Sequence, residues 1–472
     1  MRWDSLILLY KGTLRELIKT RSFTEMVAPY QQQQVQIDLY IGFDLGTSSS
    51  KVVIGNPEME STFPVVFRET EQGVEQFLVP TAFEETASEC RLVNNHCGSH
   101  SNFKLRLMDA AGAAKRPSDN DCIDLVVYAA LILRYSVKWF GEVYRQDYGH
   151  FDIVWNLAVG FPRKEICKNG ILENAYHEIL SAASVVAGGS ECITRAFAAE
   201  AIKSVRSGLA SNGLIHPDLI KIWPEIAAQL AGYMRSPYQR DGNLVLIDVG
   251  AGTLDISAII LHGPMDLRQC SFHHCAVEPL GAFRLYEKRR QMLLDEGLAD
   301  GDLKSIFSND VLAPVPESLA GYLNGNVTVS KYVERVFRNK TLRFMDKCIE
   351  AARERIVSFR QAQKKAHLNT GFDPWPGRLP VILSGGGSRL KLYDDAFRTD
   401  LEEKVRPYTR WMETRAERER SRQGFETVSM PVPDDLDLRK HDVELEFTFD
   451  RISVAHGLSY GAENLPIVTN LR

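Results

Sequence analysis

The chain has 472 residues, of which 44% are apolar and 25% charged, and its formal net charge is −5. This is the composition of a soluble globular protein with about three units of ~150 residues, and its mild acidity gives no support for binding nucleic acid or an anionic membrane surface. Eight cysteines are spread singly along the chain, and the apolar run "LILLY" is too short for a signal peptide or a membrane span. We therefore expect a cytoplasmic protein without a disulfide framework.

The apolar pattern predicts alternating strands and helices. Residues 1–34 have helical spacing that ends in "QQQQ". We interpret them as an N-terminal helical extension and linker, docked on its own domain or disordered rather than bound to a partner or a membrane. A strand-rich stretch follows from Val35 to Leu92, then an apolar helix over 122–144 and a buried strand in "FDIVWNLAVGFP". Because this alternation continues along the chain, the predicted fold class is α/β.

Residues 41–55, "IGFDLGTSSSKVVIG", predict a β-hairpin with a polar turn. Asp44 ends the first strand. The turn carries one glycine and several hydroxyl side chains, at Gly46, Thr47, Ser48 and Ser49. No helix follows directly, so the stretch is neither a Walker loop nor a dinucleotide fingerprint. A single turn of this kind is more often an ordinary hairpin than a ligand site.

Residues 243–261, "NLVLIDVGAGTLDISAIIL", repeat the pattern. A buried strand ends at Asp248, and the following residues include Gly250, Gly252, Thr253 and Asp255. Two copies of one pattern predict two similar half-domains that face each other across a cleft. Glycines allow close backbone approach, so each turn can bind phosphate through its N–H groups. The strand-end aspartates can hold Mg²⁺ through its waters, because this ion gives up its waters reluctantly.

Residues 379–397, "LPVILSGGGSRLKLYDDAF", predict a buried strand, a glycine turn and a helix. The turn consists of Gly385, Gly386, Gly387, Ser388 and Arg389. Glycines let a flat ligand lie against the backbone, and the guanidinium of Arg389 could stack on an adenine. After two phosphate-binding hairpins, this turn predicts the nucleoside end of an ATP site.

These three motifs resemble the phosphate 1, phosphate 2 and adenosine motifs of the ATPase superfamily of actin, sugar kinases and heat-shock protein 70 chaperones, and above all those of the chaperones. The resemblance covers about residues 37–464. It implies a two-lobed actin-like ATPase fold, built from duplicated ribonuclease H-like domains, with a nucleotide cleft between the lobes. It also implies that the protein binds ATP and Mg²⁺ and is an ATP hydrolase.

Further segments resemble parts of this family and imply residue roles. "NFKLRLM" resembles the segment with the catalytic lysine, which would be Lys104, although a lysine judged by its type alone is more often a surface residue. "ITRAFAAEAIKSV" resembles the first connecting helix and would place Glu200 beside the attacking water. "EPLGAFRLYE" and "IEAARERIVSFRQ" resemble the stretch after phosphate 2 and the helix beside the adenosine, and imply nucleotide contacts for Gly281, Glu350 and Arg353.

The catalytic set implied by the resemblance is Asp44, Lys104, Glu200 and Asp248. Asp44 and Asp248 would position Mg²⁺ and water, Lys104 would offset developing charge, and Glu200 would orient the water. Two departures from the family pattern stand out. The usual proline after the acid is absent at Glu200, and Ala251 replaces a glycine of phosphate 2.

The resemblance also divides the chain. The expected parts are the extension 1–34, lobe I at 35–206, an insertion at 207–242, lobe II at 243–464 with an insertion at 404–450, and a tail at 465–472. Few residues follow lobe II, so we expect the peptide-binding domain of the chaperones to be missing. Insertions on a common core are where partner contacts usually lie, and they predict an unidentified protein partner.

The function expected from this resemblance is a slow, partner-coupled ATPase that acts as a nucleotide-dependent switch or a chaperone-like motor on other proteins. The alternative is an actin-like filament former, which would self-associate. A small-molecule kinase is less favoured, because it needs a sugar or acid pocket and a catalytic base for which no motif is evident.

Two other patterns are weighed against simpler interpretations. Cys90, His96 and Cys97, and the stretch "CSFHHC", have spacings close to those of zinc ligands, but ordinary strand residues are favoured. The basic run "RAERERSR" is mixed with acidic residues, so a solvated helix face is favoured over a nucleic-acid patch.

Overall fold

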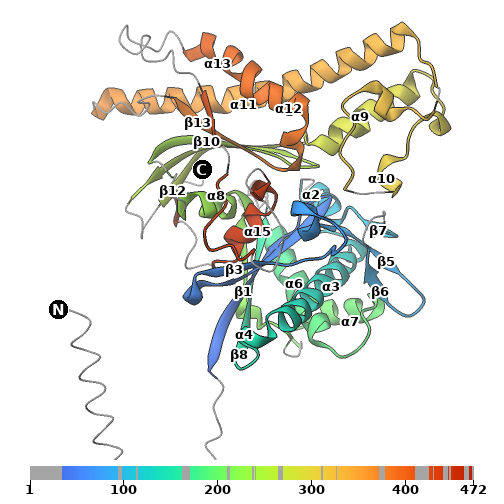
Figure 1. The fold of residues 1–472 in the computed structure, drawn as a ribbon, viewed down its shortest axis with the longest axis vertical. Helices are drawn as coiled ribbons and strands as arrows, with labels where there is room; N and C mark the ends of the chain where they lie inside the picture. Colours follow the sequence, from blue (N-terminus) through green and yellow to red (C-terminus); the bar gives the residue numbers. More distant parts are fainter. Residues whose placement is uncertain are drawn as a thin grey trace, which may run out of the picture.

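The protein is described by a computed structural model that covers residues 35–93, 98–112, 115–161, 171–209, 213–235, 239, 241–263, 269–309, 312–325, 327–370, 378–409, 425–428, 430–438, 445, 448–461 and 467–469. The predicted extension at 1–34, and His96 and Cys97, lie outside these residues. The described part contains two large mixed sheets and a small antiparallel one, with helices packed around them (Figure 1). The predicted α/β class is confirmed.

The first sheet has the strand order β3-β2-β1-β8-β9. Its strands are β1 (Gln36–Asp44), β2 (Ser49–Asn56), β3 (Ser61–Pro64), β8 (Asp152–Phe161) and β9 (Ile220–Pro224), with β4 (Val79–Pro80) paired to β2. Strands β1 to β3 form an antiparallel meander, which confirms the predicted hairpin at 41–55. Strand β8 pairs parallel with β1, and β9 pairs parallel with β8.

The second sheet has the order β14-β13-β10-β11-β12-β15. Its strands are β10 (Gly242–Val249), β11 (Leu254–His262), β12 (Gln269–Glu278), β13 (Leu379–Ser384), β14 (Phe425–Val428) and β15 (Ile467–Thr469). Strands β10 to β12 form an antiparallel meander, β13 pairs parallel with β10, and β14 pairs parallel with β13. Apart from β15, this repeats the order and directions of the first sheet, with β10 in the place of β1.

Helices and short strands surround the first sheet. They are α2 (Phe103–Gly112), α3 (Asp119–Val143), α4 (Arg145–Tyr148), α6 (Ile171–Gly188) and α7 (Arg195–Arg206), with the three-stranded sheet of β5 (Ala82–Glu85), β6 (Cys90–Leu92) and β7 (His100–Ser101). The predicted helix over 122–144 corresponds to α3, whose N-cap Ser118 accepts a hydrogen bond from the N–H of Asp121. Side chains from α3 and α6 join those of β1 and β8 in one large apolar core.

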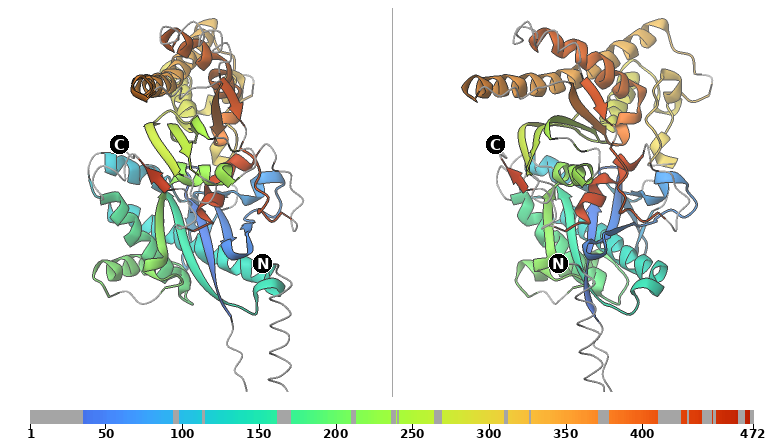
Figure 2. Two further views of the ribbon diagram at one scale, coloured as in Figure 1. Left: turned by 90° about the vertical axis from the view of Figure 1, so that its left-hand side faces the viewer. Right: turned by 60° about the vertical axis from the view of Figure 1, so that its left-hand side comes forward.

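The second sheet has its own helices. They are α9 (Ala282–Asp295), α10 (Ile306–Asn309), α11 (Lys331–Thr370), α12 (Lys391–Asp395) and α13 (Leu401–Thr409). The residues of β10 alternate between two cores. Val245 and Ile247 pack in the core that holds α9 and α11, whereas Leu244 and Leu246 pack in the core shared with the first sheet. The second sheet therefore lies between α11 and the first half of the molecule (Figure 2).

Two helices cross between the sheets, α8 (Glu225–Arg235) and α15 (Ser453–Leu458). They pack on each other, and α15 also packs on β1 and β2. Small residues make these close contacts possible. A Cβ built at Gly457 would overlap the backbone oxygen of Ala228, and one built at Gly42 would overlap the oxygen of Ala455.

The structure corrects three of the expected boundaries. The segment 207–242, expected to be an insertion, supplies the core strand β9 and the crossing helix α8. The expected insertion at 404–450 supplies β14, and its residue Asp435 accepts a hydrogen bond of 2.8 Å from the N–H of Thr62 on β3. The expected tail supplies β15, which pairs with β12. These segments are parts of the fold because they complete or cover sheet edges.

Among the described residues, no helix is long and apolar enough to cross a membrane.

The crossing of α8 and α15 gives a first prediction. Replacing Gly457 by alanine should destabilise the protein by about 1–3 kcal/mol, because the new Cβ overlaps the backbone of α8 and the helices must separate. Denaturant unfolding measures this change. The matched control is Gly141→Ala on α3, where a Cβ meets nothing within 4 Å, and which should be neutral or stabilising by up to ~1 kcal/mol. Equal stability of the two variants would contradict the tight crossing.

Candidate functional site

The turns of the two repeated hairpins lie against each other. A Cβ built at Gly252, in the β10–β11 turn, would lie 3.3 Å from Thr47 Oγ1 in the β1–β2 turn and 3.0 Å from Leu105 Cδ2 of α2. Two turns that are far apart in sequence therefore meet at one place, between the sheets. This contact is compatible with the predicted facing half-domains.

The first turn is held from the side by Thr81. Its hydroxyl donates to the carbonyl oxygen of Gly46 over 2.9 Å, and its N–H donates to the carbonyl oxygen of Ser48 over 3.0 Å. Ser49 then enters β2 opposite Pro80. The polar turn is thus built into the sheet edge, which fixes its shape.

The second turn is held by the N-terminus of α9. The N–H of Ala282 donates to the oxygen of Gly250 over 3.0 Å, and the N–H of Phe283 donates to the oxygen of Ala251 over 2.8 Å. The first N–H groups of a helix have no partner within the helix, and here the turn supplies partners for them. Gly281 is required before α9, because a Cβ there would overlap the oxygen of Ala251.

Two lysines and two carboxylates form ion pairs beside the turns. Lys51 Nζ lies 3.0 Å from Asp44 Oδ2, and Lys104 Nζ lies 2.5 Å from Glu225 Oε1. Lys104 is at the first turn of α2, and Glu225 is the first residue of α8. Burial lowers the pKa of Lys104, but Glu225, Tyr176 and Asp44 outweigh this and raise it above its usual value. Lys104 is therefore a buried cation within the site.

Two further carboxylates lie at facing positions of the second hairpin. Asp248 on β10 pairs in register with Asp255 on β11, as Asp44 pairs with Lys51. Burial, together with the charges of Glu225 and Asp44, raises the pKa of Asp248 to about 6. Burial and the charges of Asp248 and Glu225 also raise the pKa of Asp255.

One oxygen of Asp255 is left without a partner. Its Oδ2 accepts from Thr253 Oγ1 over 3.1 Å, whereas Oδ1 is buried and has no hydrogen-bond partner among the described residues. Buried polar atoms in proteins are almost always paired. The site is therefore suited to a cation or to ordered water at this oxygen.

The third predicted turn rests on the end of β10. Gly385 has a φ of 84°, and a Cβ there would overlap Asp248 Oδ1. Ser388 Oγ closes the turn by donating to the oxygen of Gly385 over 2.7 Å. A Cβ at Gly387 would lie 2.6 Å from Val249 Cγ1. The Asp248 carboxylate and the glycine turn are therefore in contact, and a larger residue at Gly385 or Gly387 would push the turn away from β10.

Two arginines lie near this turn. Arg389 pairs with Asp450 over 2.8 Å. The Nε atom of Arg451 lies 3.6 Å from a Cβ built at Gly386, and its Nη1 lies 2.9 Å from Glu75 Oε1 of the first half. Sequence reasoning selected Arg389 but not Arg451, whose neighbours Gly386 and Glu75 lie far from it in the chain.

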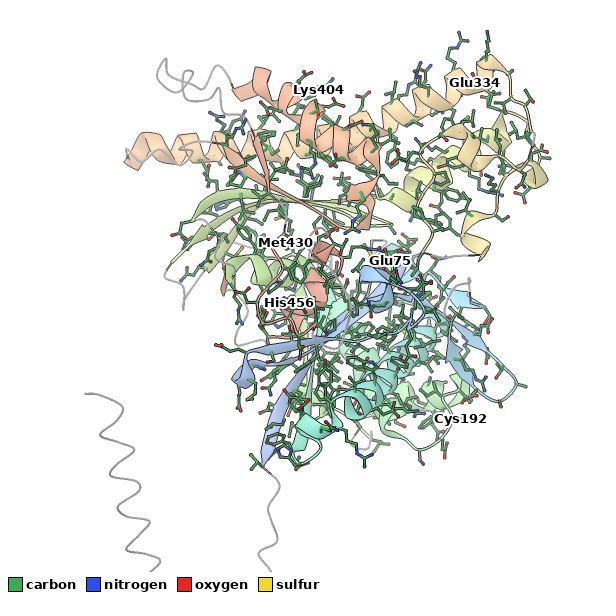
Figure 3. The ribbon with its side chains drawn as sticks, in the orientation of Figure 1. Glu75, Cys192, Glu334, Lys404, Met430 and His456 are labelled. Atoms are coloured by element: carbon green, nitrogen blue, oxygen red, sulfur yellow. The ribbon has the colours of Figure 1, made fainter. Side chains whose placement is uncertain are left out.

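Glu350 and Arg353 are paired with each other. Arg353 Nε donates to Glu350 Oε2 over 2.7 Å, and this bond, with the charges of Arg353 and Lys404, lowers the pKa of Glu350. Lys404 lies on the side of α11 away from the first sheet (Figure 3). The positive charge of Lys404 on α13 therefore acts on the Glu350 carboxylate. The expected contact between Glu350 and a nucleotide stays a prediction.

Glu200 is not part of this cluster, which corrects its predicted role. It is exposed on α7, and α7 packs against α3 and α6. The acid beside Lys104 is Glu225. The segment that could have identified Glu225 is "IKIWPEIAAQLAGY". It consists of a short strand, Pro-Glu and an apolar helix, and it lies before the second hairpin. In the structure this segment forms β9 and α8, which lead into β10.

No protein-family model and no curated protein matches the chain. Among the described residues, no group of three His, Cys, Asp or Glu side chains is placed to hold a metal ion directly. Cys270, His273, His274 and Cys275 lie in β12, in agreement with the interpretation as ordinary strand residues.

The buried Lys104–Glu225 pair gives a second prediction. Replacing Lys104 by methionine should cost about 3–5 kcal/mol of stability at pH 8, because an unpaired carboxylate stays buried. The loss should be smaller at pH 5. Burial raises the pKa of Glu225 in the folded state, so the folded protein takes up a proton and the charge is removed as the pH falls.

Urea unfolding at the two pH values measures this dependence. The control is Lys391→Met, which removes an exposed pair with Asp395 and should leave stability close to that of the parent at either pH. A Lys104→Met loss that is the same at pH 5 and pH 8 would contradict the buried pair.

Proposed function

We propose that this chain is a Mg²⁺-dependent ATPase with a two-lobed, actin-like architecture, similar to the nucleotide-binding part of heat-shock protein 70 chaperones. The observation that supports it most is the meeting of two topologically equivalent hairpins, each with an aspartate at the end of its first strand. The phosphates of ATP would bind between these turns. Turns with glycines suit this role because they allow close approach to backbone N–H groups.

The residues present fit a divalent cation. Asp44, Asp248, Asp255 and Glu225 carry acidic side chains in one place, two of them paired to Lys51 and Lys104. Bound Mg²⁺ would neutralise charge on the phosphates and on the remaining carboxylates. Asp44 and Asp248 would hold it through water, in keeping with its preference for retained waters.

The chain's own residues have distinct roles in the proposed hydrolysis. Lys104, held by Glu225, would offset the negative charge that develops on the transferring phosphoryl group. Glu225 would accept a hydrogen bond from the attacking water and orient it. Catalysis of phosphoryl transfer depends mostly on such positioning and charge stabilisation. The adenosine would lie on the turn at 385–389, beside Arg389 and Arg451.

The proposed output is a nucleotide-dependent switch on a partner protein. Helices α8 and α15 connect the halves and cross at one tight contact, so a change in how the hairpins grip phosphate would rotate one half against the other. A partner that prefers one nucleotide state would shift this equilibrium by its difference in affinity. We propose this chaperone-like role ahead of filament formation.

The assignment of Glu225 gives a third prediction, which tests the proposed function. Glu225→Gln should retain ATP binding and slow turnover by about 10²-fold or more, the scale expected for a positioned acid–base group. The matched control, Glu200→Gln, should hydrolyse ATP at the parent rate because Glu200 is exposed on α7. Phosphate release under saturating ATP and Mg²⁺ measures both. If Glu200→Gln is the slow variant, Glu225 has been assigned wrongly.

A fourth prediction concerns the basal rate. The ion pair with Lys104 makes Glu225 a weaker proton acceptor for the attacking water, so basal turnover should lie well below the ~1 s⁻¹ at the low end for typical enzymes. The protein should also stay in the supernatant on centrifugation with ATP and Mg²⁺. ATP-dependent pelleting would instead support the filament-forming alternative.

A further inference from the structure

Gln229 is a buried polar side chain of α8 that lies directly beneath the proposed site. It is 2% exposed. Its Nε2 lies 2.6 Å from Asp248 Oδ2 and 2.6 Å from Ser384 Oγ. An amide nitrogen has two hydrogens, and these two contacts use both of them. The amide group of Gln229 is therefore held in one orientation.

The two acceptors are neighbours in the second sheet. Asp248 is the last but one residue of β10, and Ser384 is its register partner on the parallel strand β13. Gly385, the first residue of the glycine turn, follows Ser384 and lies against Asp248 Oδ1. One oxygen of the Asp248 carboxylate thus faces the turn, and the other is held by Gln229.

The position of Gln229 on its helix links the two halves of the site. Glu225 and Gln229 are four residues apart, so both lie on one face of α8. Glu225 contacts Lys104 of the first half, and Gln229 contacts Asp248 of the second. A displacement of α8 therefore moves both contacts together.

We infer that Gln229 is a positioning residue, which orients the Asp248 carboxylate and couples it to the Glu225–Lys104 pair through α8. This inference rests on the proposed function of the site. Without the amide, Oδ2 of Asp248 has lost its donor and the carboxylate can rotate. Asp248 would then no longer present an acceptor of fixed direction toward a hydrated Mg²⁺, and the coupling between the halves would weaken.

The test is Gln229→Met, which keeps an unbranched side chain of similar length and good helix propensity but removes the amide. Turnover at saturating ATP should fall by about 10- to 100-fold, the size of effect expected for one hydrogen bond to a charged group. The Mg²⁺ concentration for half-maximal activity should rise, while ATP binding without Mg²⁺ stays unchanged. In an Asp248→Asn background, Gln229→Met should have little further effect, since the two act through one contact.

The control is Ser384→Ala, which removes the second acceptor and leaves the contact between Gln229 and Asp248. It should retain the Mg²⁺ dependence of the parent. If Gln229→Met lowers only the unfolding temperature and leaves turnover and Mg²⁺ dependence unchanged, the inference is wrong and the ATPase proposal stands. If the parent protein does not turn over ATP, the proposed function itself fails, and the inference fails with it.

Discussion

Like charges held close together in a partly buried space are the constraint on which this structure depends. Burial makes the ionised forms of Glu225, Asp248 and Asp255 costly, and neighbouring negative charges raise their pKa values further. Lys51 and Lys104 offset part of this cost. The remaining cost appears as raised pKa values, to about 6 for Asp248 and well above the usual value for Asp255. Under the proposed function, a bound cation would lower this electrostatic cost.

The surrounding fold serves to keep these groups in place. In each sheet the first strand of the meander carries an aspartate at or next to its end, and the turns that follow are tied down by Thr81 and by the start of α9. Helix α8 then joins the halves, because Glu225 in its first turn contacts Lys104 and Gln229 in its second turn contacts Asp248. Because α8 also crosses α15 at Gly457, the site and the connection between the halves share one rigid element.

Much of this could be predicted from the sequence, for identifiable reasons. The two hairpins and the glycine turn follow from local patterns, namely buried strands that end in Asp or Ser and are followed by glycines, so Asp44, Asp248 and Gly385 were found. Glu225 was not, because a short strand before Pro-Glu is a weak local signal and Glu200 lies in a more regular helix. Gln229, Lys51 and Arg451 could not be found locally, since their roles arise from pairing across the chain. Strands β9, β14 and β15 were assigned to insertions or to a tail for the same reason.

The most direct test of the account is a calorimetric titration of the parent protein with ATP, in the presence and absence of Mg²⁺. The account predicts one nucleotide bound per chain, with tighter binding when Mg²⁺ is present, because the cation relieves repulsion between the phosphates and the carboxylates of Asp44, Asp248 and Asp255. Absence of binding under both conditions, or binding that Mg²⁺ weakens, would contradict it.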